Sequence, residues 1–451
     1  MLKFDDEFIF GTATSSFQIE GATYRDGRTP SIWDEFCKKP GKVRNGDTGD
    51  VACEHYIRYE EDIELIKELG VNSYRFSIAW PRIFPEQGVF NEAGMAFYRN
   101  LVIGLVDAGI KPVATLYHWD LPMWAYEKGG WLNRESVVWF LEYAQKCFEE
   151  LDSYVDSWIT HNEPWCASFL SYHLGVHAPG HRNIEEGLKA AHYILLSHGK
   201  VVEYYKNQFH GQKPIGITLN LAPVYSASES FEDQLAANNK DGYTNRWFLD
   251  AIFKGTYPAD MVNLFSKQVH SFSFIEKDDL EVISIPCDFF GINYYARELV
   301  EFDSLSPTLS TEAYSNYPKT GMGWDVSPKE FKELIYRLRK EYTELPIYIT
   351  ENGAAYDDVL LDDGRVHDAE RTKYLEEHLQ AIHELNEDGQ RVAGYYLWSL
   401  FDNFEWAFGY EKRFGIMYVD FNTQKRYWKD SARRYQEIVS KRELSMQISV
   451  K

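Results

Sequence analysis

The sequence lacks any long uncharged hydrophobic run. No uncharged stretch reaches the roughly 18 residues that a membrane-spanning helix needs, and residues 1–7 contain no apolar segment of the kind found in signal peptides. Cysteine is also scarce: the five residues are scattered, odd in number and without C-x-x-C spacing, so no disulfide framework is expected. These absences predict a cytoplasmic protein with reduced thiols and no membrane partner.

The chain carries too little positive charge for a nucleic-acid partner. Lysine and arginine number 47 against 69 aspartate and glutamate residues, which gives a formal net charge of −22. Such a surface repels phosphates, so we expect no nucleic acid among the partners. The excess of acids favours solubility, and a strongly anionic substrate would need a local basic pocket.

Cofactor and metal motifs are missing as well. Neither G-x-G-x-x-G nor G-x-x-x-x-G-K-[ST] occurs, which argues against a nucleotide cofactor. His173, His177 and His181 recur every four residues, but Pro179 and Gly180 would break a helix that aligned them. We therefore expect loop or structural histidines, no metal and no cofactor.

Aromatic residues, in contrast, are abundant: 13 Trp, 31 Tyr and 28 Phe. Most of them are expected in a large hydrophobic core. Tryptophan can also form flat apolar walls with one polar edge. Sugar rings suit such walls, because they have an apolar C–H face and a rim of hydroxyl groups.

Short β-rich runs alternate with amphipathic stretches along almost the whole chain. The eight runs are 8–11, 73–78, 112–117, 157–160, 214–219, 288–292, 346–350 and 392–397. The helical stretches are 56–69, 92–108, 136–151, 184–209, 328–342, 369–386 and 431–441, with a further one at 230–269 broken at Gly255 and Pro258. Eight buried strands alternating with helices predict an α/β fold, a (β/α)8 TIM barrel with extended βα loops. An open doubly wound sheet is the alternative, but its usual Gly-rich turn is absent.

Polar residues follow these runs at the ends where TIM barrels carry their chemistry. Arg75 lies within the second run; the others are His118, Asn162, Glu163, Asn220, Asn293, Tyr295, Glu351, Asn352 and Trp398. Each alone could cap a loop. Their common placement at one face of the barrel indicates an active site.

Two of these residues, Glu163 and Glu351, form a carboxylate pair on the fourth and seventh runs. One carboxyl group of such a pair can protonate a leaving oxygen while the other meets the positive charge that develops at an anomeric carbon. The pair therefore predicts cleavage of an acetal. Ionisation of one of the two carboxyl groups is expected to keep the other protonated, which predicts a bell-shaped pH profile.

Several strings extend this pattern: THNEP at 160–164, ITENG at 349–353, FGTATSS at 10–16, YRFS at 74–77, LYHWDLP at 116–122, GINYY at 291–295, DNFEW at 402–406 and RFG at 413–415. Together they resemble glycoside hydrolase family 1, the β-glucosidase family. The likeness covers nearly the whole chain and implies one catalytic domain over residues 1–451.

The resemblance implies particular roles for fifteen residues. Glu351 matches the nucleophile, Glu163 the acid/base, and Arg75, Asn293 and Tyr295 the groups that hold the nucleophile. Residues that match substrate ligands are Gln18, His118, Trp119, Asn162, Trp165, Trp324, Trp398, Glu405, Trp406 and Phe414. Trp165 and Trp324 belong to the aglycone side, and the loop at 304–325 is expected to build part of that subsite.

Sub-branches of the family separate at a few positions. Relatives that cleave thioglucosides carry glutamine where Glu163 stands, and the 6-phospho-glycosidase branch replaces the Glu405-Trp406 pair and adds a phosphate clamp. Here the pair is present without the clamp, and Lys412 and Arg413 are expected to be surface or loop residues. The resemblance thus implies a retaining β-glucosidase acting on small β-glucosides and cello-oligosaccharides, with β-galactosides or β-fucosides as further substrates.

Other readings stay open. A 6-phospho-β-glycosidase and a catalytically inactive sugar-binding barrel are the alternatives within the fold. An aldolase-like barrel enzyme would need a lysine at an inner strand end, and Lys111 precedes its strand. The sequence leaves the oligomeric state undecided, with a homo-oligomer among the choices.

Overall fold

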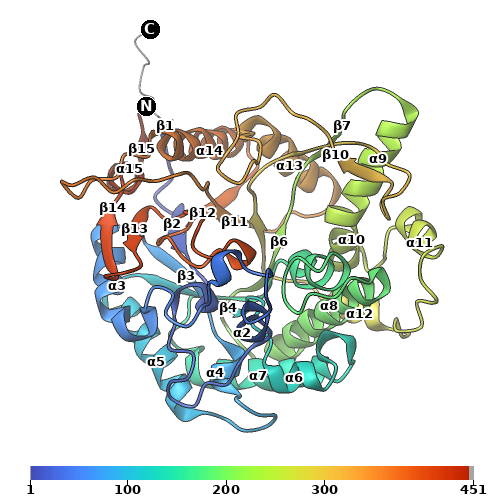
Figure 1. Ribbon diagram of the computed structural model, residues 1–451, viewed down its shortest axis with the longest axis horizontal. Coiled ribbons are helices and arrows are strands. Elements are labelled where there is room, and N and C mark those ends of the chain that lie inside the picture. The colour runs from blue at the N-terminus through green and yellow to red at the C-terminus, as the bar shows by residue number, and fades with distance from the viewer. Residues whose placement is uncertain (1, 446–451) are drawn as a thin grey trace.

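The computed structural model describes residues 2–445, so both ends of the expected domain, residue 1 and residues 446–451, lie outside the described part. Eight parallel strands close into a barrel. In their order around the barrel they are β11 (Ile347–Asn352), β12 (Val392–Trp398), β2 (Ile9–Ala13), β3 (Ser73–Ser77), β4 (Lys111–Tyr117), β5 (Ser157–Asn162), β6 (Ile215–Asn220) and β8 (Phe289–Asn293). Figure 1 shows the helices as a ring around these strands. The predicted TIM barrel is confirmed.

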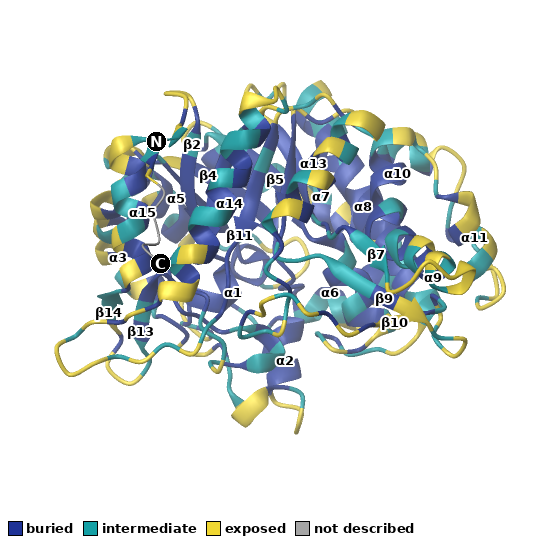
Figure 2. Cartoon of the chain, turned by 90° about the horizontal axis from the view of Figure 1, so that it is seen from above, coloured by how far each residue is buried: buried dark blue, intermediate teal, exposed yellow. Residues whose placement is uncertain are grey.

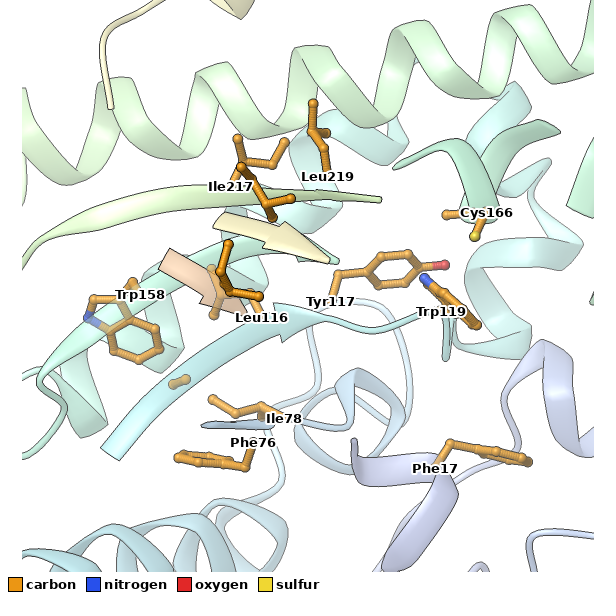
Figure 3. Packing of buried hydrophobic residues seen from close by; sticks show 14 of the residues in the cluster. Phe17, Phe76, Ile78, Leu116, Tyr117, Trp119, Trp158, Cys166, Ile217 and Leu219 are labelled. Atoms are coloured by element: carbon orange, nitrogen blue, oxygen red, sulfur yellow. The ribbon is translucent and has the colours of Figure 1, made fainter. Parts of the chain in front are cut away.

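Each barrel strand falls on one of the eight predicted runs. The runs read as apolar on both faces because the strands are covered inside and outside. On the inside, a small cluster that includes Val113, Ile159, Phe289 and Tyr396 fills the barrel. On the outside, strand residues pack against the helices, and Figure 3 shows Ile217 and Leu219 of β6 in this layer.

The helices that cover the barrel match the predicted amphipathic stretches closely. They are α3 (His55–Leu69), α5 (Glu92–Asp107), α7 (Ser136–Leu151), α8 (Ile184–Asn207), α13 (Pro328–Glu341), α14 (Ala369–Glu387) and α15 (Asp430–Lys441). Their inner faces are buried and their outer faces exposed, as Figure 2 shows by colour. In the part of the chain that the structure describes, no helix is both long and apolar enough to cross a membrane.

The predicted breaks between residues 230 and 269 also occur. The segment forms α9 (Phe231–Asp241), the π-helix Gly242–Arg246, α10 (Trp247–Lys254) and α11 (Ala259–Phe265). Gly255 ends α10 with φ of 64°, in the left-handed region that glycine adopts without strain. Pro258 precedes α11, where its missing N–H costs no hydrogen bond.

The connections after the strands are long and carry additional structure. The short helices are α1 (Ser16–Ile19), α2 (Ile32–Cys37), α4 (Trp80–Ile83), α6 (Met123–Glu127) and α12 (Asp279–Ile283), and a π-helix spans Cys166–His173. Three strands, β7 (Val224–Ser226), β9 (Glu298–Phe302) and β10 (Ser310–Glu312), form a separate sheet. Two small pairs complete the structure: β13 (Met417–Asp420) with β14 (Lys425–Trp428), and β1 (Leu2–Lys3) with β15 (Glu443–Leu444). These connections build the extended βα loops that the sequence predicted.

Candidate active site

A cavity of about 640 Å³ opens at the carboxyl ends of the barrel strands. Twelve of the fifteen predicted site residues line it: His118, Trp119, Glu163, Trp165, Asn293, Tyr295, Trp324, Glu351, Trp398, Glu405, Trp406 and Phe414. They come from strands and loops spread over most of the sequence. The barrel therefore brings the predicted residues into one pocket.

The other three predicted residues, Gln18, Arg75 and Asn162, are fully buried and contact residues of the lining. Arg75 joins two of the groups around it, because its Nη1 donates to Glu351 Oε1 at 2.7 Å and its Nη2 donates to Asn162 Oδ1 at 2.6 Å. These side chains contact the pocket residues and fix their orientation.

Glu351, in β11, is held at both carboxylate oxygens. Arg75 binds Oε1, and the hydroxyl of Tyr295 donates to Oε2 at 2.6 Å. Burial raises the pKa of Glu351, while the Arg75 charge and the hydrogen bond from Tyr295 oppose that rise. Because both contacts favour the charged form, we assign the carboxylate form to Glu351.

Glu163 follows β5 directly and takes a left-handed backbone conformation, with φ of 51°. The amide of Asn293 donates to its Oε1 at 2.6 Å and also to Asn162 Oδ1 at 3.0 Å. Positive φ values also occur at Trp119 (79°) and Trp406 (50°). Backbone strain of this kind gathers at functional sites, where the surrounding structure holds it in place.

The environment keeps Glu163 protonated. Burial is the main cause that raises the pKa of Glu163 to about 8, and the charge of Glu351 is the second. From the sequence we expected only the charge of Glu351 to raise this pKa, whereas burial makes the larger contribution. A protonated carboxyl group beside a carboxylate provides an acid and a nucleophile in one cavity.

A third carboxyl group, that of Glu405, lines the same pocket. Its pKa is raised to about 8 by burial, and the charges of Glu351 and Glu163 add to the rise. Gln18, on α1, donates from Nε2 to the Phe404 carbonyl at 2.9 Å and lies 3.4 Å from Glu405 Oε2. Carboxyl and amide groups in this fork can exchange hydrogen bonds with vicinal hydroxyl groups.

His118 adds another polar atom to the pocket. Burial and the charge of Arg75 hold its pKa well below the usual range, so the imidazole is neutral. Its Nε2 lies 3.2 Å from the amide nitrogen of Asn162, and its Nδ1 has no hydrogen-bond partner in the protein. A buried unpaired nitrogen beside the cavity is suited to a hydroxyl group of a ligand.

Aromatic rings form the walls. Trp398 stacks on His118 with ring centroids 5.9 Å apart, and Trp406 packs on Trp119 at 4.5 Å. The ring centroid of Trp324 lies 5.4 Å from that of Tyr295 and 6.1 Å from that of Phe414. Trp165 also lines the pocket, and its indole N–H has no hydrogen-bond partner among the described residues.

The three regularly spaced histidines have different neighbours. His173 bonds the hydroxyl of Tyr243, and His181 lies between Tyr126 and Glu186. His177 packs against aromatic rings, and burial lowers its pKa to about 3. Among the described residues, no group of three or more metal-ligating side chains comes together.

The loop placement of Lys412 and Arg413 is as expected, but neither side chain extends freely from the surface. Lys412 Nζ donates to the Gly321 carbonyl at 2.7 Å, and Arg413 Nη1 donates to Asp402 Oδ2 at 2.6 Å. Neither residue lines the pocket. Both cations thus serve contacts between loops.

Some pocket residues were missed at the sequence level. Cys166 was read only as a reduced thiol; it lines the cavity, as Glu163 does. Figure 3 shows Cys166 near Trp119 at the strand ends. Lys240 and Tyr243 also line the cavity, as do Leu299 and Val300 of β9. Only Cys166 had a usable signal, its position three residues after Glu163. The expected loop at 304–325 does contribute, with Ser306, Pro307, Thr308 and Trp324 among its lining residues.

Known proteins match this chain over nearly its full length. A GH1 β-glucosidase structure from Exiguobacterium antarcticum B7 superposes with a TM-score of 0.97 at 64% identity, covering 99% of this chain and 100% of the other. β-Glucosidase A of Acetivibrio thermocellus is 45% identical over 97% of this chain and 98% of its own length. A bifunctional β-D-glucosidase/β-D-fucosidase of Bifidobacterium breve is 40% identical, with the same coverage.

The family model for glycosyl hydrolase family 1 matches residues 2–444. That span contains the barrel, both carboxyl groups and all fifteen predicted site residues. The chain therefore belongs to glycosyl hydrolase family 1.

Proposed function

We propose that Glu351 and Glu163 carry the β-glucosidase activity of this chain. The observation that carries the proposal is their contrast in environment within one cavity: Arg75 and Tyr295 bind the oxygens of Glu351, whereas Glu163 is buried with a pKa of about 8. The enzyme is a retaining β-glycosidase, which needs one ionised and one protonated carboxyl group at the start of the reaction.

In the first displacement, Glu351 attacks the anomeric carbon of the sugar. The bond from that carbon to the aglycone oxygen breaks, and Glu163 transfers its proton to this oxygen. The product is an ester between Glu351 and the sugar. The guanidinium group of Arg75 and the hydroxyl group of Tyr295 position the attacking carboxylate.

In the second displacement, water attacks the same carbon. The negative charge of Glu351 is lost in the ester, so Glu163, which gave its proton to the aglycone, can stay ionised and accept a proton from the water. The bond between the sugar and Glu351 then breaks, and β-glucose leaves. The two inversions give net retention.

The glycone that we propose is a neutral hexose. Gln18, His118, Asn162 and Glu405 can serve its hydroxyl groups, and Trp398 provides a flat wall beside them. The β-galactosides and β-fucosides are proposed as further substrates, since the named activity of the Bifidobacterium breve relative includes β-D-fucosidase. The aglycone lies toward Trp165 and Trp324, and short cello-oligosaccharides are proposed as natural substrates in cellulose breakdown.

A 6-phospho-glycoside is the second candidate glycone. Glu405 opposes it, because a carboxyl group supplies no positive charge to a phosphate and repels it once ionised, and Lys412, the nearest candidate cation in the sequence, donates to the Gly321 carbonyl. The inactive-barrel alternative is opposed by the presence of both carboxyl groups in the cavity.

We also propose that the activity resides in one catalytic domain and needs no nucleic acid or membrane. A cytoplasmic location is supported by five cysteines that are all free and buried. Whether the working enzyme is a monomer or a homo-oligomer is open to measurement by light scattering.

The test is hydrolysis of p-nitrophenyl β-D-glucoside near neutral pH with EDTA present. Wild type should release nitrophenol rapidly, and Glu351→Gln should fall to near background. The matched control is Glu330→Gln, which changes a buried glutamate of α13 outside the cavity and should keep the activity. If folded wild type fails on this substrate but cleaves the 6-phospho-glucoside, the phosphate candidate replaces the glucoside.

A further inference from the structure

Lys429 is a buried cation that holds two aspartates together. It lies between β14 and α15, and its side chain is fully buried. Its Nζ is 2.5 Å from Asp358 Oδ2 and 2.7 Å from Asp402 Oδ1. A charge buried this deeply is retained only where its partners are close and well oriented.

Asp358 belongs to the segment that follows Glu351 and β11. Arg371, on α14, binds both oxygens of Asp358 at 3.0 and 2.7 Å. The same guanidinium group donates from Nε to the carbonyl of Ala354 at 3.0 Å. Since Ala354 lies three residues after Glu351, this side of the ionic network fixes the backbone that continues from the proposed nucleophile.

Asp402 belongs to the segment that follows β12 and stands three residues before Glu405. Its Oδ2 accepts from Arg413 at 2.6 Å, and its Oδ1 accepts from the backbone N–H of Gly415 at 3.0 Å. Phe414, between these two donors, lines the cavity. This side of the network fixes the loop that carries Glu405 and Phe414.

The two segments also touch directly. A Cβ atom added at Gly353 would lie 1.7 Å from the carbonyl oxygen of Trp398. Only glycine allows so close an approach, so no space separates the loop after Glu351 from the loop after β12. A shift of one segment is therefore passed to the other.

We propose that Lys429 is a positioning residue for the glycone subsite, which sets Glu405 relative to Glu351 through Asp402 and Asp358. It contacts neither the cavity nor a bound sugar. The inference rests on the proposed roles of Glu405 and Glu351. It predicts that loss of Lys429 reduces activity mainly by moving Glu405.

The test is a double-mutant cycle of Lys429→Met with Glu405→Gln. The substrate is 2,4-dinitrophenyl β-D-glucoside, and the initial burst counts active sites, so unfolded protein does not enter kcat/KM. We expect Lys429→Met to lower kcat/KM about tenfold in the wild-type background and less than about twofold in the Glu405→Gln background, since residues coupled through one ionic network and a shared backbone shift act non-additively. Equal losses in both backgrounds would overturn the proposal.

Lys429→Met leaves two buried aspartates without their cation and can fail to fold. Asp358→Asn is the second variant, because it keeps the shape and leaves Lys429 paired with Asp402. Asp358→Asn should also lower kcat/KM more in the wild-type background than in the Glu405→Gln background, but by a smaller factor than Lys429→Met. The control is Arg134→Met, which removes a partner of Asp279 outside the cavity and should cause equal loss in both backgrounds.

The choice of sugar gives a second readout. 6-Deoxy-D-glucose lacks only the 6-hydroxyl group, so its glycoside has one hydroxyl group fewer to lose contact with Glu405. Lys429→Met should therefore lower kcat/KM for the glucoside several-fold more than for the 6-deoxyglucoside, and an unchanged ratio would contradict the proposal. If wild type cleaves neither glycoside, the proposed function itself is wrong, whatever the behaviour of Lys429.

Discussion

The hydroxyl group of Tyr295 donates a 2.6 Å hydrogen bond to Oε2 of Glu351. Tyr295→Phe removes this bond to a charged acceptor, which is worth about 1.5–3 kcal/mol. Only the part of this energy that is greater in the transition state than in the ground state lowers the barrier, so kcat should fall by at most roughly 10- to 150-fold. The bond also lowers the pKa of Glu351, so its loss should move the acidic limb of the kcat/KM profile to higher pH.

The control for this prediction is the neighbouring tyrosine. Tyr294 donates to the carbonyl of Ser327 at 2.7 Å and does not line the cavity. Tyr294→Phe should lower the melting temperature without moving the acidic limb. A similar limb for Tyr295→Phe and wild type would exclude the proposed contact with the working nucleophile.

Glu163→Gln should slow cleavage most for substrates whose leaving oxygen must be protonated. Loss of a general acid costs about 10²–10⁴-fold, and the full loss is expected for alkyl glucosides, whose leaving oxygens need a proton. Dinitrophenolate leaves without one, so the first displacement on the dinitrophenyl glucoside should be nearly unaffected. The values of kcat/KM for the two substrates report the first displacement and measure this difference. Equal slowing of the two would assign the acid to another residue.

The basic limb of the wild-type profile should depend on Cys166. Burial raises the pKa of this thiol well above its usual value, so it stays protonated and can donate to Glu163. Donation from this thiol favours the ionised form of Glu163 and opposes the rise of its pKa, which lies at about 8. Cys166→Ala should therefore move the basic limb of kcat/KM to higher pH.

Two further variants sharpen this test. Cys166→Ser restores a donor and should return the limb toward its wild-type position. Cys147→Ala removes a buried thiol of α7 outside the cavity and should leave the limb unchanged. A downward shift in Cys166→Ala would mean that the thiol does not stabilise the ionised form of Glu163.

Glu405 should make the free enzyme less stable as the pH rises. Its pKa is about 8 in the folded chain against an ordinary 4.5, so between these values the unfolded chain binds fewer protons and unfolding becomes more favourable. Glu405→Gln cannot titrate. Its melting temperature relative to wild type should be higher at pH 8 than at pH 5, as measured by calorimetry; a constant difference would show that Glu405 ionises normally.

The barrel was predictable because its strands leave a strong local signal. Each strand is buried on both sides, so each appears as a short apolar run, and α7 begins and ends where its amphipathic pattern does. The strands β7, β9 and β10 were not foreseen, since they are short and partly exposed. Nor were the π-helices Cys166–His173 and Gly242–Arg246, because their sequences resemble those of ordinary helices.

The candidate site was only partly predictable from the residues themselves. Glu163 and Glu351 could be found from the residues, because strand ends meet at one face of a barrel. Gln18 and Glu405 lie 387 positions apart, and only the family resemblance joined them. Lys429 and Asp402 gave no local signal, since an ionic network between distant loops depends on how those loops pack.

Barrel closure joins the first and last strands of the ring, with Ile9 paired to Gly394 and Ala13 to Trp398. A growing chain that has not yet added β12 therefore holds two unpaired strand edges, on β2 and β11, and such edges favour association with other chains. During synthesis, β2 can pair with β12 only after almost the whole sequence has been made. We therefore expect that productive folding in the cell depends more on keeping the unpaired edge of β2 from associating with other chains than on forming the helices.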